Sequence, residues 1–349
     1  MINIGLNGFG RIGRALVRAN LEKPRCSFTV INDIDPNVEN HAYLLRHDSL
    51  YGRLEVDMQA QQASSRLIIN GQETAFLHCR SLEDVSWSAE GASVVVDATG
   101  VEDHVDMARK LIDEGGLSHI LLSYVPRQPT DFTMIYGVND QEFDPNAHRL
   151  ISTATCDANA VGPILRIVDE AFGIVEAHIT TLHPWLAYQN LLDGSVRSVS
   201  SPSHFWEDFG LGRASTLSLI PKETTLVRVL QRAMPSVAEN TFAISFRVPT
   251  PIVSAADMTI TLRSPCTQRN VTDALRAAAR ALPHLINLID EPLVSIDVLG
   301  LPQSAVIQES WIRLQSPVSL KLVAWYDNEW AYAERILDTL SRLDSGDLP

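Results

Sequence analysis

The chain has 349 residues, and its hydrophobic share, 45%, is that of an ordinary globular protein. Its formal net charge of −14 disfavours nonspecific binding of nucleic acid, because an acidic surface repels the phosphate backbone. At about 150 residues per domain, this length predicts two domains.

No apolar stretch approaches the roughly 20 residues that a membrane span requires, and no basic segment precedes the first apolar run. The four cysteines are scattered and form no Cys-x-x-Cys pair, which disfavours a zinc site and a disulfide framework. We therefore expect a cytoplasmic protein with no metal, no membrane partner and no nucleic-acid partner.

A glycine-rich turn follows the first apolar run, Ile2–Leu6, and precedes a helical pattern from Arg11 to about Leu21. Its glycines permit a tight turn, close approach of a pyrophosphate to the backbone, and close packing of the helix on a sheet. Strand, turn and helix together predict a dinucleotide-binding unit. The glycines are Gly8, Gly10 and Gly13.

The second apolar run, Phe28–Ile31, ends in Asn32 and Asp33. Asp33 lies close to the offset, about 20 residues, at which a carboxylate meets the adenosine ribose hydroxyls. A carboxylate there disfavours a 2′-phosphate. The sequence therefore predicts NAD rather than NADP as the cofactor.

Short apolar runs alternate with helical patterns over residues 1 to about 150, which predicts an α/β fold with a Rossmann-type, mostly parallel sheet. The runs Val94–Asp97, Ile120–Ser123 and Met134–Val138 are predicted strands, and Val101–Glu114 is a predicted helix. Ser123, at a strand end, is either a neighbour of the cofactor or a turn residue only.

The second half predicts an α+β domain with a largely antiparallel sheet, because its apolar runs are longer and often alternate. A helix is predicted over Asp157–Phe172 and another over Glu329–Leu343. The loop between Pro184 and Gly212 is too long for a passive connection, so we expect it to serve a site or an interface. The predicted strands are Ile174–Leu182, Thr241–Val248, Ala255–Leu262 and Ser319–Trp325.

Cys156 lies where an extended segment, Arg149–Ser152, gives way to a predicted helix. A helix N-terminus stabilises a thiolate, so this cysteine is a candidate nucleophile. His183 ends a predicted strand and is a candidate for shuttling protons to and from the thiolate. The alternatives are a small buried apolar cysteine and a histidine, one of ten, with a structural role only.

Several segments carry a family resemblance along nearly the whole chain: Asn7–Arg14, Ile31–Asp33, His47–Ser49 with Gly52-Arg53, Asp97–Gly100, Phe246–Pro251 and Trp325–Glu329. In this order they resemble the glyceraldehyde-3-phosphate dehydrogenases and the related erythrose-4-phosphate dehydrogenases. The resemblance implies an NAD-binding Rossmann domain over residues 1–155, completed by a C-terminal helix at 328–349. It also implies a catalytic domain over 156–327 and a homotetramer.

The resemblance also implies a reaction, in which a cysteine attacks an aldehyde and a histidine activates it. Hydride passes to NAD, and the resulting thioester passes to inorganic phosphate or, in some relatives, to water. Cys156 and His183 align with the two reacting positions. The implied cofactor contacts are Arg11, Ile12, Asp33, Arg80, Ser123 and Asn328, and the implied phosphate contacts are Arg213, Thr224 and Arg247. Each of these arginines could instead form a surface salt bridge.

The chain departs from the family at its substrate site, where Thr155-Cys156-Asp157 replaces the usual Ser-Cys-Thr. An ionised Asp157 can only accept hydrogen bonds, so it should repel a phosphate and oppose thiolate formation. Asp157 is either a base that activates water or an acidic first-turn residue that points outward. Three further substitutions make the pocket narrower and more apolar: Leu186, Tyr188 and Thr225.

These observations favour NAD-dependent oxidation of a small, phosphorylated or otherwise anionic aldehyde. One alternative is an erythrose-4-phosphate dehydrogenase-like enzyme with water as acceptor. Another is a degenerate paralogue that binds NAD as a sensor or interaction protein, although such a protein would need neither Cys156 nor His183. Semialdehyde dehydrogenases are disfavoured because they carry a different glycine turn and usually prefer NADP, against which Asp33 argues.

Overall fold

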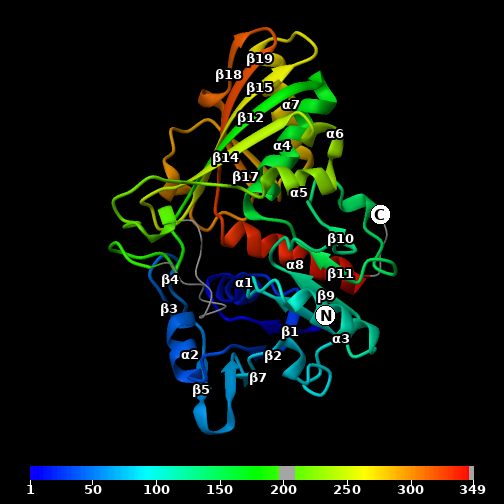
Figure 1. Cartoon of the computed structure of the whole chain (residues 1–349), viewed down its shortest axis with the longest axis vertical. Helices are drawn as coiled ribbons and strands as arrows, with labels where there is room; N and C mark the ends of the chain where they lie inside the picture. The colour runs from blue at the N-terminus through cyan, green and yellow to red at the C-terminus, as the bar shows by residue number, and fades with distance from the viewer. Residues whose placement is uncertain (196–208, 346–349) are drawn as a thin grey trace. The chain divides into compact units, whose positions relative to one another are not determined.

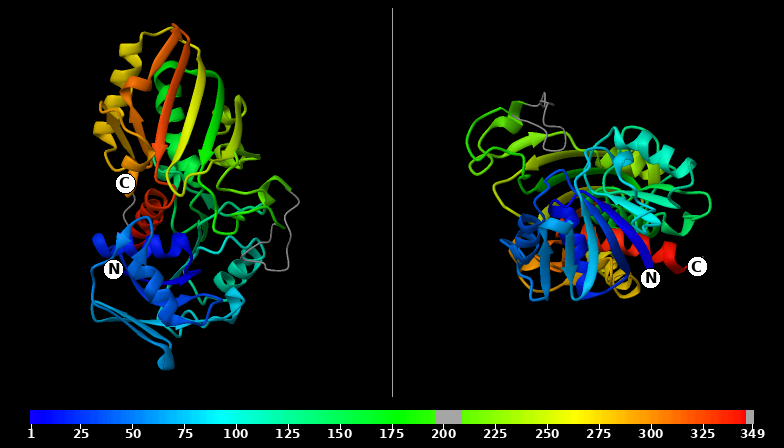
Figure 2. Two further views of the ribbon diagram at one scale, coloured as in Figure 1. Left: turned by 90° about the vertical axis from the view of Figure 1, so that its left-hand side faces the viewer. Right: turned by 90° about the horizontal axis from the view of Figure 1, so that it is seen from below.

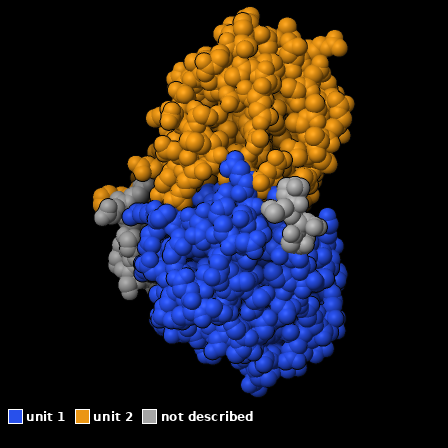
Figure 3. Space-filling view, turned by 90° about the vertical axis from the view of Figure 1, so that its right-hand side faces the viewer, with its two compact units in different colours: residues 1–134, 142–153, 333–349 blue, residues 135–141, 154–332 orange. Residues whose placement is uncertain are grey.

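The computed structural model describes residues 1–195 and 209–345, and the chain divides into two compact units, which Figure 3 colours separately. Unit 1 comprises Met1–Met134, Glu142–Thr153 and Ala333–Pro349. Unit 2 comprises Ile135–Gln141 and Ala154–Tyr332. Each unit has its own sheet.

In the described part of unit 1, nine strands form one sheet in the order β10-β11-β9-β8-β1-β2-β7-β6-β5. Neighbours from β10 to β7 are parallel, whereas β5, β6 and β7 pair antiparallel. A separate two-stranded ribbon joins β3 (His47–Asp48) to β4 (Gly52–Arg53). The strands of the sheet are β1 (Ile2–Asn7), β2 (Cys26–Asn32), β5 (Met58–Gln61), β6 (Arg66–Ile69), β7 (Gln72–Leu77), β8 (Val94–Asp97), β9 (His119–Leu122), β10 (Phe132–Thr133) and β11 (Leu150–Ser152).

Helices complete unit 1 and tie the end of the chain to its beginning (Figure 1). They are α1 (Arg11–Glu22), α2 (Val38–Arg46), α3 (His104–Asp113) and α8 (Trp330–Ser345), of which α8 enters unit 1 at Ala333. Arg25, which precedes β2, pairs with Glu334 at 2.6 Å and with Asp338 at 2.9 Å, both on α8. These ion pairs are little exposed, so they hold α8 on this unit.

The predicted strand over Met134–Val138 is wrong, because the chain turns there. The strand β10 ends at Thr133, and the next backbone N–H groups are taken by side chains. Ile135 N donates to Asn139 Oδ1 at 2.9 Å, and Gly137 N donates to Asp140 Oδ1 at 2.8 Å. Asn and Asp side chains offer the backbone such alternatives to a strand ladder.

Unit 2 has eight described strands in the order β13-β14-β12-β15-β19-β17-β16, with β18 paired to β19. Most neighbours are antiparallel; β12 with β14 and β16 with β17 are parallel. The predicted fold class, a Rossmann-type sheet plus a largely antiparallel α+β domain, is thereby confirmed. The strands are β12 (Ile174–His183), β13 (Ile220–Lys222), β14 (Thr241–Arg247), β15 (Ser254–Leu262), β16 (Ile286–Ile289), β17 (Ala305–Gln308), β18 (Arg313–Ser316) and β19 (Ser319–Tyr326).

The helix α4 (Cys156–Phe172) is the central helix of unit 2 and lies along β12, β15 and β19 (Figures 1 and 2). Its buried face is apolar, with Val161, Ile164 and Leu165 fully buried. Burial of each such side chain stabilises the fold by about 1.5–3 kcal/mol. The N-terminus of α4 is therefore fixed relative to the sheet. The other helices are α5 (Leu226–Ala233), α6 (Pro235–Ala238) and α7 (Gln268–Ala281).

The predicted loop from Pro184 to Gly212 is described only in part, since residues 196–208 lie outside the described residues. Its far end is a short 3-10 turn, Phe209–Gly212. Among residues 1–195 and 209–345, no helix is both long and apolar enough to cross a membrane.

Candidate active site

Polar side chains from four strands lie at one end of the unit 2 sheet. His183 and Arg247 end the parallel strands β12 and β14 and are paired in register. Ser254 begins β15 and is paired with Tyr326, which ends β19. The strand pairing thus places four functional groups at the same end of one sheet.

Cys156 reaches this end of the sheet from the first turn of α4. The approach is strained, because Ala154 has φ of 61° in the left-handed region that favours glycine. Tyr332 Oη holds this conformation by donating to Ala154 O at 3.0 Å. Thr155, the N-cap residue, is extended, so the backbone turns sharply into the helix. The turn directs the cysteine toward the strand ends.

Asp157 points inward, which excludes one of its two predicted alternatives, an outward first-turn residue. Its side chain is buried, with 3% of the residue exposed. Three hydrogen-bond donors of the protein contact its carboxylate. Thr155 Oγ1 donates to Oδ1 at 2.5 Å, and Ala158 N donates to the same oxygen at 2.9 Å. Thr224 Oγ1 donates to Oδ2 at 3.1 Å. The carboxylate is thus a fixed part of the site.

His183 stands beside this carboxylate. Its Nε2 lies 3.7 Å from Asp157 Oδ2, which is longer than a direct hydrogen bond. Its Nδ1 lies 3.4 Å from Ser254 Oγ, and its ring packs edge-on against Tyr326. Nε2 is therefore the nitrogen that faces Asp157, while Ser254 occupies the other side of the ring.

Burial sets the protonation of the site. It lowers the pKa of His183, although the charge of Asp157 opposes it, so the imidazole is neutral and able to accept a proton. Burial alone would raise the pKa of Asp157, but the interactions with His183, Thr155 and Thr224 hold it well below its usual range. A carboxylate with so low a pKa is a fixed charge rather than a proton acceptor.

Burial, which is the larger effect, and the negative charge of Asp157 together raise the pKa of the Cys156 thiol to about 12. The positive charges of Arg247 and Lys222 oppose this shift. At neutral pH the thiol of the free protein is therefore protonated. A base must remove its proton when substrate arrives.

We expect iodoacetamide to alkylate Cys156 slowly at neutral pH and faster as the pH rises past the ordinary thiol value of 9.0. Only the thiolate reacts, and a raised pKa delays its appearance to higher pH. Mass spectrometry of the Cys156 peptide after timed labelling gives the profile, with glutathione as reference. A midpoint at or below that of glutathione would contradict this electrostatic description.

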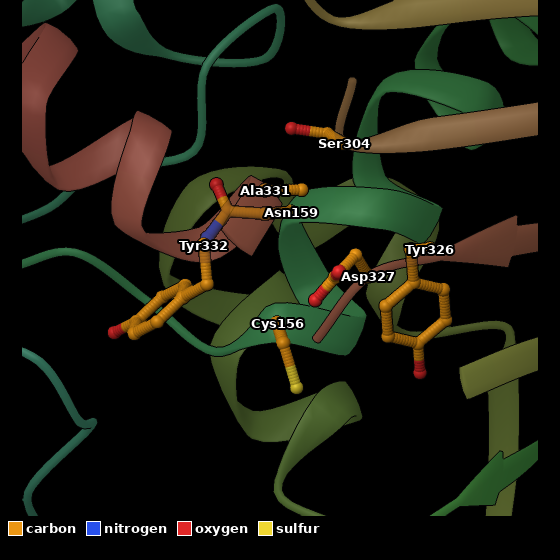
Figure 4. Close-up of a pocket in the computed structure, with 7 residues that line it drawn as sticks. All are labelled: Cys156, Asn159, Ser304, Tyr326, Asp327, Ala331 and Tyr332. Carbon is orange, nitrogen blue, oxygen red and sulfur yellow. The ribbon is translucent and has the colours of Figure 1, made fainter. Parts of the chain in front are cut away.

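A small hollow lies beside Cys156 within unit 2. In Figure 4 the sulfur of Cys156 and the hydroxyl of Tyr326 point in the same direction, away from Ser304. The hollow is lined by Cys156, Asn159, Ser304, Tyr326, Asp327, Ala331 and Tyr332.

Arg247 is the one predicted phosphate-binding arginine that the structure places in this cluster. Its Nη1 donates to Pro184 O at 3.0 Å, and its Nε is buried with no hydrogen-bond partner among the described residues. An unused buried donor is costly unless a ligand satisfies it. Arg213, by contrast, forms an exposed ion pair with Asp193 at 3.0 Å.

The remaining predicted substrate residues are Thr225, Tyr188 and Leu186. Thr225 is the exposed N-cap residue of α5. Tyr188 packs against Leu211 and Ile220, and its hydroxyl interacts electrostatically with Arg247. Leu186 is partly buried, and its N–H donates to Gln189 Oε1 at 2.8 Å.

Three residues of the cluster were not predicted from the sequence: Lys222, Ser254 and Tyr326. The positive charge of Lys222 acts to lower the pKa of both Cys156 and His183, although burial and Asp157 raise the pKa of Cys156 overall. The places of Ser254 and Tyr326 depend on strand pairing, which the sequence does not display.

The glycine turn of unit 1 has the geometry that a bound pyrophosphate requires. Gly8 has φ of 94°, and a Cβ on Gly13 would collide with Gly8 O. A Cβ on Gly10 would meet nothing within 4 Å, so this face of the turn is open for a ligand. Gly10 is the N-cap residue of α1 and no side chain caps this end of the helix, which is the kind of helix N-terminus that binds a phosphate.

The predicted ribose carboxylate lies beside this turn, since Phe9 N donates to Asp33 Oδ2 at 2.7 Å. Ser123 follows β9, and its N–H bonds Asp97 O at 2.9 Å, while Arg80 is exposed beyond β7. Arg11 bonds Asp48 at 2.5 Å, and Ile12 is partly buried in α1. These residues fit a dinucleotide on unit 1.

Asn328 belongs to unit 2, where its Oδ1 is buried with no hydrogen-bond partner among the described residues. Such an oxygen suits the amide group of a nicotinamide, which can donate to it.

Comparison with known proteins agrees with both halves of this description. Residues 2–104 match the family model "Glyceraldehyde 3-phosphate dehydrogenase, NAD binding domain", and residues 155–328 match its C-terminal domain. A glyceraldehyde-3-phosphate dehydrogenase of Geobacillus stearothermophilus is 33% identical over 99% of this chain and 98% of its own. Glyceraldehyde-3-phosphate dehydrogenase 3, cytosolic, of Oryza sativa subsp. japonica is 31% identical with the same coverage.

Proposed function

The chain belongs to the glyceraldehyde-3-phosphate dehydrogenase family, and we propose that, as an NAD-dependent dehydrogenase of this family, it oxidises a small anionic aldehyde through a thioester on Cys156. The observation that carries this proposal is the cluster at the N-terminus of α4, where the partly exposed Cys156 lies with the buried Asp157 and His183. Nucleophile, base and fixed charge meet there.

In the proposed reaction His183 accepts the thiol proton as Cys156 Sγ attacks the aldehyde carbon. The neutral imidazole suits this step, because the raised pKa of the thiol prevents spontaneous ionisation. Bound NAD supplies the hydride acceptor that turns the cysteine adduct into a thioester. His183 first passes the thiol proton to the carbonyl oxygen, which becomes the hydroxyl of the adduct, and takes it back as the hydride leaves.

The anionic nature of the substrate is supported by Arg247, whose buried Nε has no partner among the described residues, and by the charge of Lys222. An arginine presents a planar fork of donors that matches a phosphate or a carboxylate. Tyr188 and Leu186 add apolar surface beside it. We therefore propose a small phosphorylated or carboxylated aldehyde.

We assign residues 1–155 with 328–349 to NAD binding and 156–327 to catalysis. The open glycine turn and Asp33 support the first assignment, and the cluster around Cys156 supports the second. A cytoplasmic location is also part of the proposal, supported by the cytosolic relative from rice.

The test of this function is NADH formation from NAD and a panel of aldehydes matched in length, with a phosphate, a carboxylate or a hydroxyl at the far end. We expect the anionic members to react and the neutral one to react poorly. If no aldehyde yields even one NADH per active site, the alternative of an NAD-binding sensor is favoured instead.

We further propose that the chain assembles as a homotetramer. The face of β12 and β14 that bears Leu182, Phe242 and Ile244 is exposed, at 36%, 63% and 43% respectively. These side chains are neighbours, because Leu182 and Ile244 lie two positions apart across paired strands. An exposed face that carries three large apolar side chains is typical of an interface between subunits.

Replacing Phe242 by aspartate should therefore reduce the assembly, since a buried unpaired charge opposes association. Light scattering coupled to gel filtration would measure the mass of the variant against the wild type. Glu170→Gln, an exposed carboxylate on the helix α4 rather than on these strands, is the control. An unchanged mass for Phe242→Asp would place the interface elsewhere.

A further inference from the structure

We propose that water, and not an anion such as inorganic phosphate, takes the acyl group from Cys156, with Asp157 as the positioning residue that excludes the anion and holds the water against His183. This inference rests on the proposed function, since it concerns the fate of the same thioester.

The first argument is that the donors of an anion site are already taken. An anion at the N-terminus of α4 would bind hydroxyls and backbone N–H groups there. The Asp157 carboxylate already accepts from Thr155 Oγ1, Thr224 Oγ1 and Ala158 N. The protein therefore carries its own anion in this place. A second anion at this helix end would find these three donors occupied.

The second argument is charge. Asp157 is buried, and its interactions with the neighbouring donors keep its pKa low, so it stays ionised throughout the working pH range. A buried charge is poorly screened, and an anionic acceptor brought beside it is repelled. Water, which is neutral and donates hydrogen bonds, is attracted instead.

The third argument is the gap between His183 Nε2 and Asp157 Oδ2. At 3.7 Å the two atoms are too far apart for a direct hydrogen bond, while a water beside them can donate to both. Because such a water donates both hydrogens to these atoms, a lone pair of its oxygen points away from His183 and Asp157. Ser254 Oγ lies 3.4 Å from Nδ1, which keeps Nε2 as the nitrogen facing the water.

The step is balanced as a hydrolysis. The water oxygen forms a bond to the acyl carbon, and the bond between that carbon and Cys156 Sγ breaks. One water proton passes to His183 Nε2 and then to the departing sulfur. The products are a carboxylic acid and the free thiol, and Asp157 neither gains nor loses a proton.

The first experiment follows the wild-type enzyme in buffer made with ¹⁸O-labelled water, with NAD and the aldehyde that reacts best in the panel. We expect continuous turnover without phosphate, no stimulation when phosphate is added, and one ¹⁸O in the carboxylate product. Turnover that needs phosphate and yields an acyl phosphate would overturn the inference. A burst of one NADH without turnover would also overturn it and leave the proposed function standing, whereas absence of the burst would reject the proposed function.

The second experiment separates positioning from folding. Asp157→Asn should keep the burst of NADH but slow steady-state turnover about tenfold or more, because hydrolysis of the thioester loses its oriented water. Asp157→Thr should gain stimulation by phosphate. Glu170→Gln, an exposed carboxylate on the same helix, is the control and should leave both phases unchanged. Equal slowing of burst and turnover in Asp157→Asn, or no stimulation by phosphate in Asp157→Thr, would contradict the role of Asp157.

Discussion

Replacing Cys156 by serine is expected to abolish NADH formation, with a loss in kcat on the order of 10⁴-fold or more. Serine keeps the shape of the side chain but loses the nucleophile, because its hydroxyl is far harder to ionise than a thiol. Binding of NAD should be unaffected, since the glycine turn and Asp33 lie in unit 1. The measurement is initial NADH formation, together with NAD affinity by calorimetry.

Cys266→Ser is the matched control for that change. Cys266 is also a partly exposed cysteine of unit 2, and it lies outside the cluster around Cys156. Its replacement should leave kcat within a factor of about two. If Cys156→Ser retained activity within tenfold of the wild type while Cys266→Ser lost it, the nucleophile would have been assigned to the wrong cysteine.

Replacing His183 by asparagine should lower kcat on the order of 10²- to 10⁴-fold, which is the usual contribution of a positioned general base. Asparagine retains polarity in a buried position but cannot accept the thiol proton. Because the pKa of His183 is lowered, wild-type activity should persist at pH values below the ordinary histidine pKa of 6.5 and fall only when the imidazole becomes protonated. The variant should lack this acidic limb in its pH profile.

His178→Asn tests whether any histidine of β12 has this effect. His178 lies on the same strand, is exposed, and pairs with Glu176 at 2.7 Å. Its replacement should change neither kcat nor the acidic limb. A His183→Asn variant whose activity stays close to the wild type, with the limb intact, would exclude His183 as the base.

Much of the fold follows from local patterns in the sequence. The strand β8 was predicted with its observed bounds, Val94–Asp97, because a short apolar run buried on both faces is distinct. The start of α4 at Cys156 was predicted within one residue, since extended and helical patterns change there. The glycine turn and Asp33 were predicted together because their spacing reflects one βαβ unit.

Other features depend on contacts that no local pattern encodes. The run Met134–Val138 is apolar, yet Asn139 and Asp140 draw its N–H groups into a turn. The direction of Asp157 is decided by Thr224, which lies far away in the sequence and meets it only through the fold. Helix propensity alone allowed Asp157 to face solvent. The role of Asp157, which is the strongest departure from the family, could therefore be interpreted only with the structure.

The most direct test of the central claim, a thioester on Cys156, is a single turnover with NAD and a reactive anionic aldehyde, quenched in acid and analysed by mass spectrometry. We expect one NADH per active site and an acyl mass on the peptide that contains Cys156, formed without phosphate. NADH formation without an adduct on Cys156, or with the adduct on another residue, would contradict it.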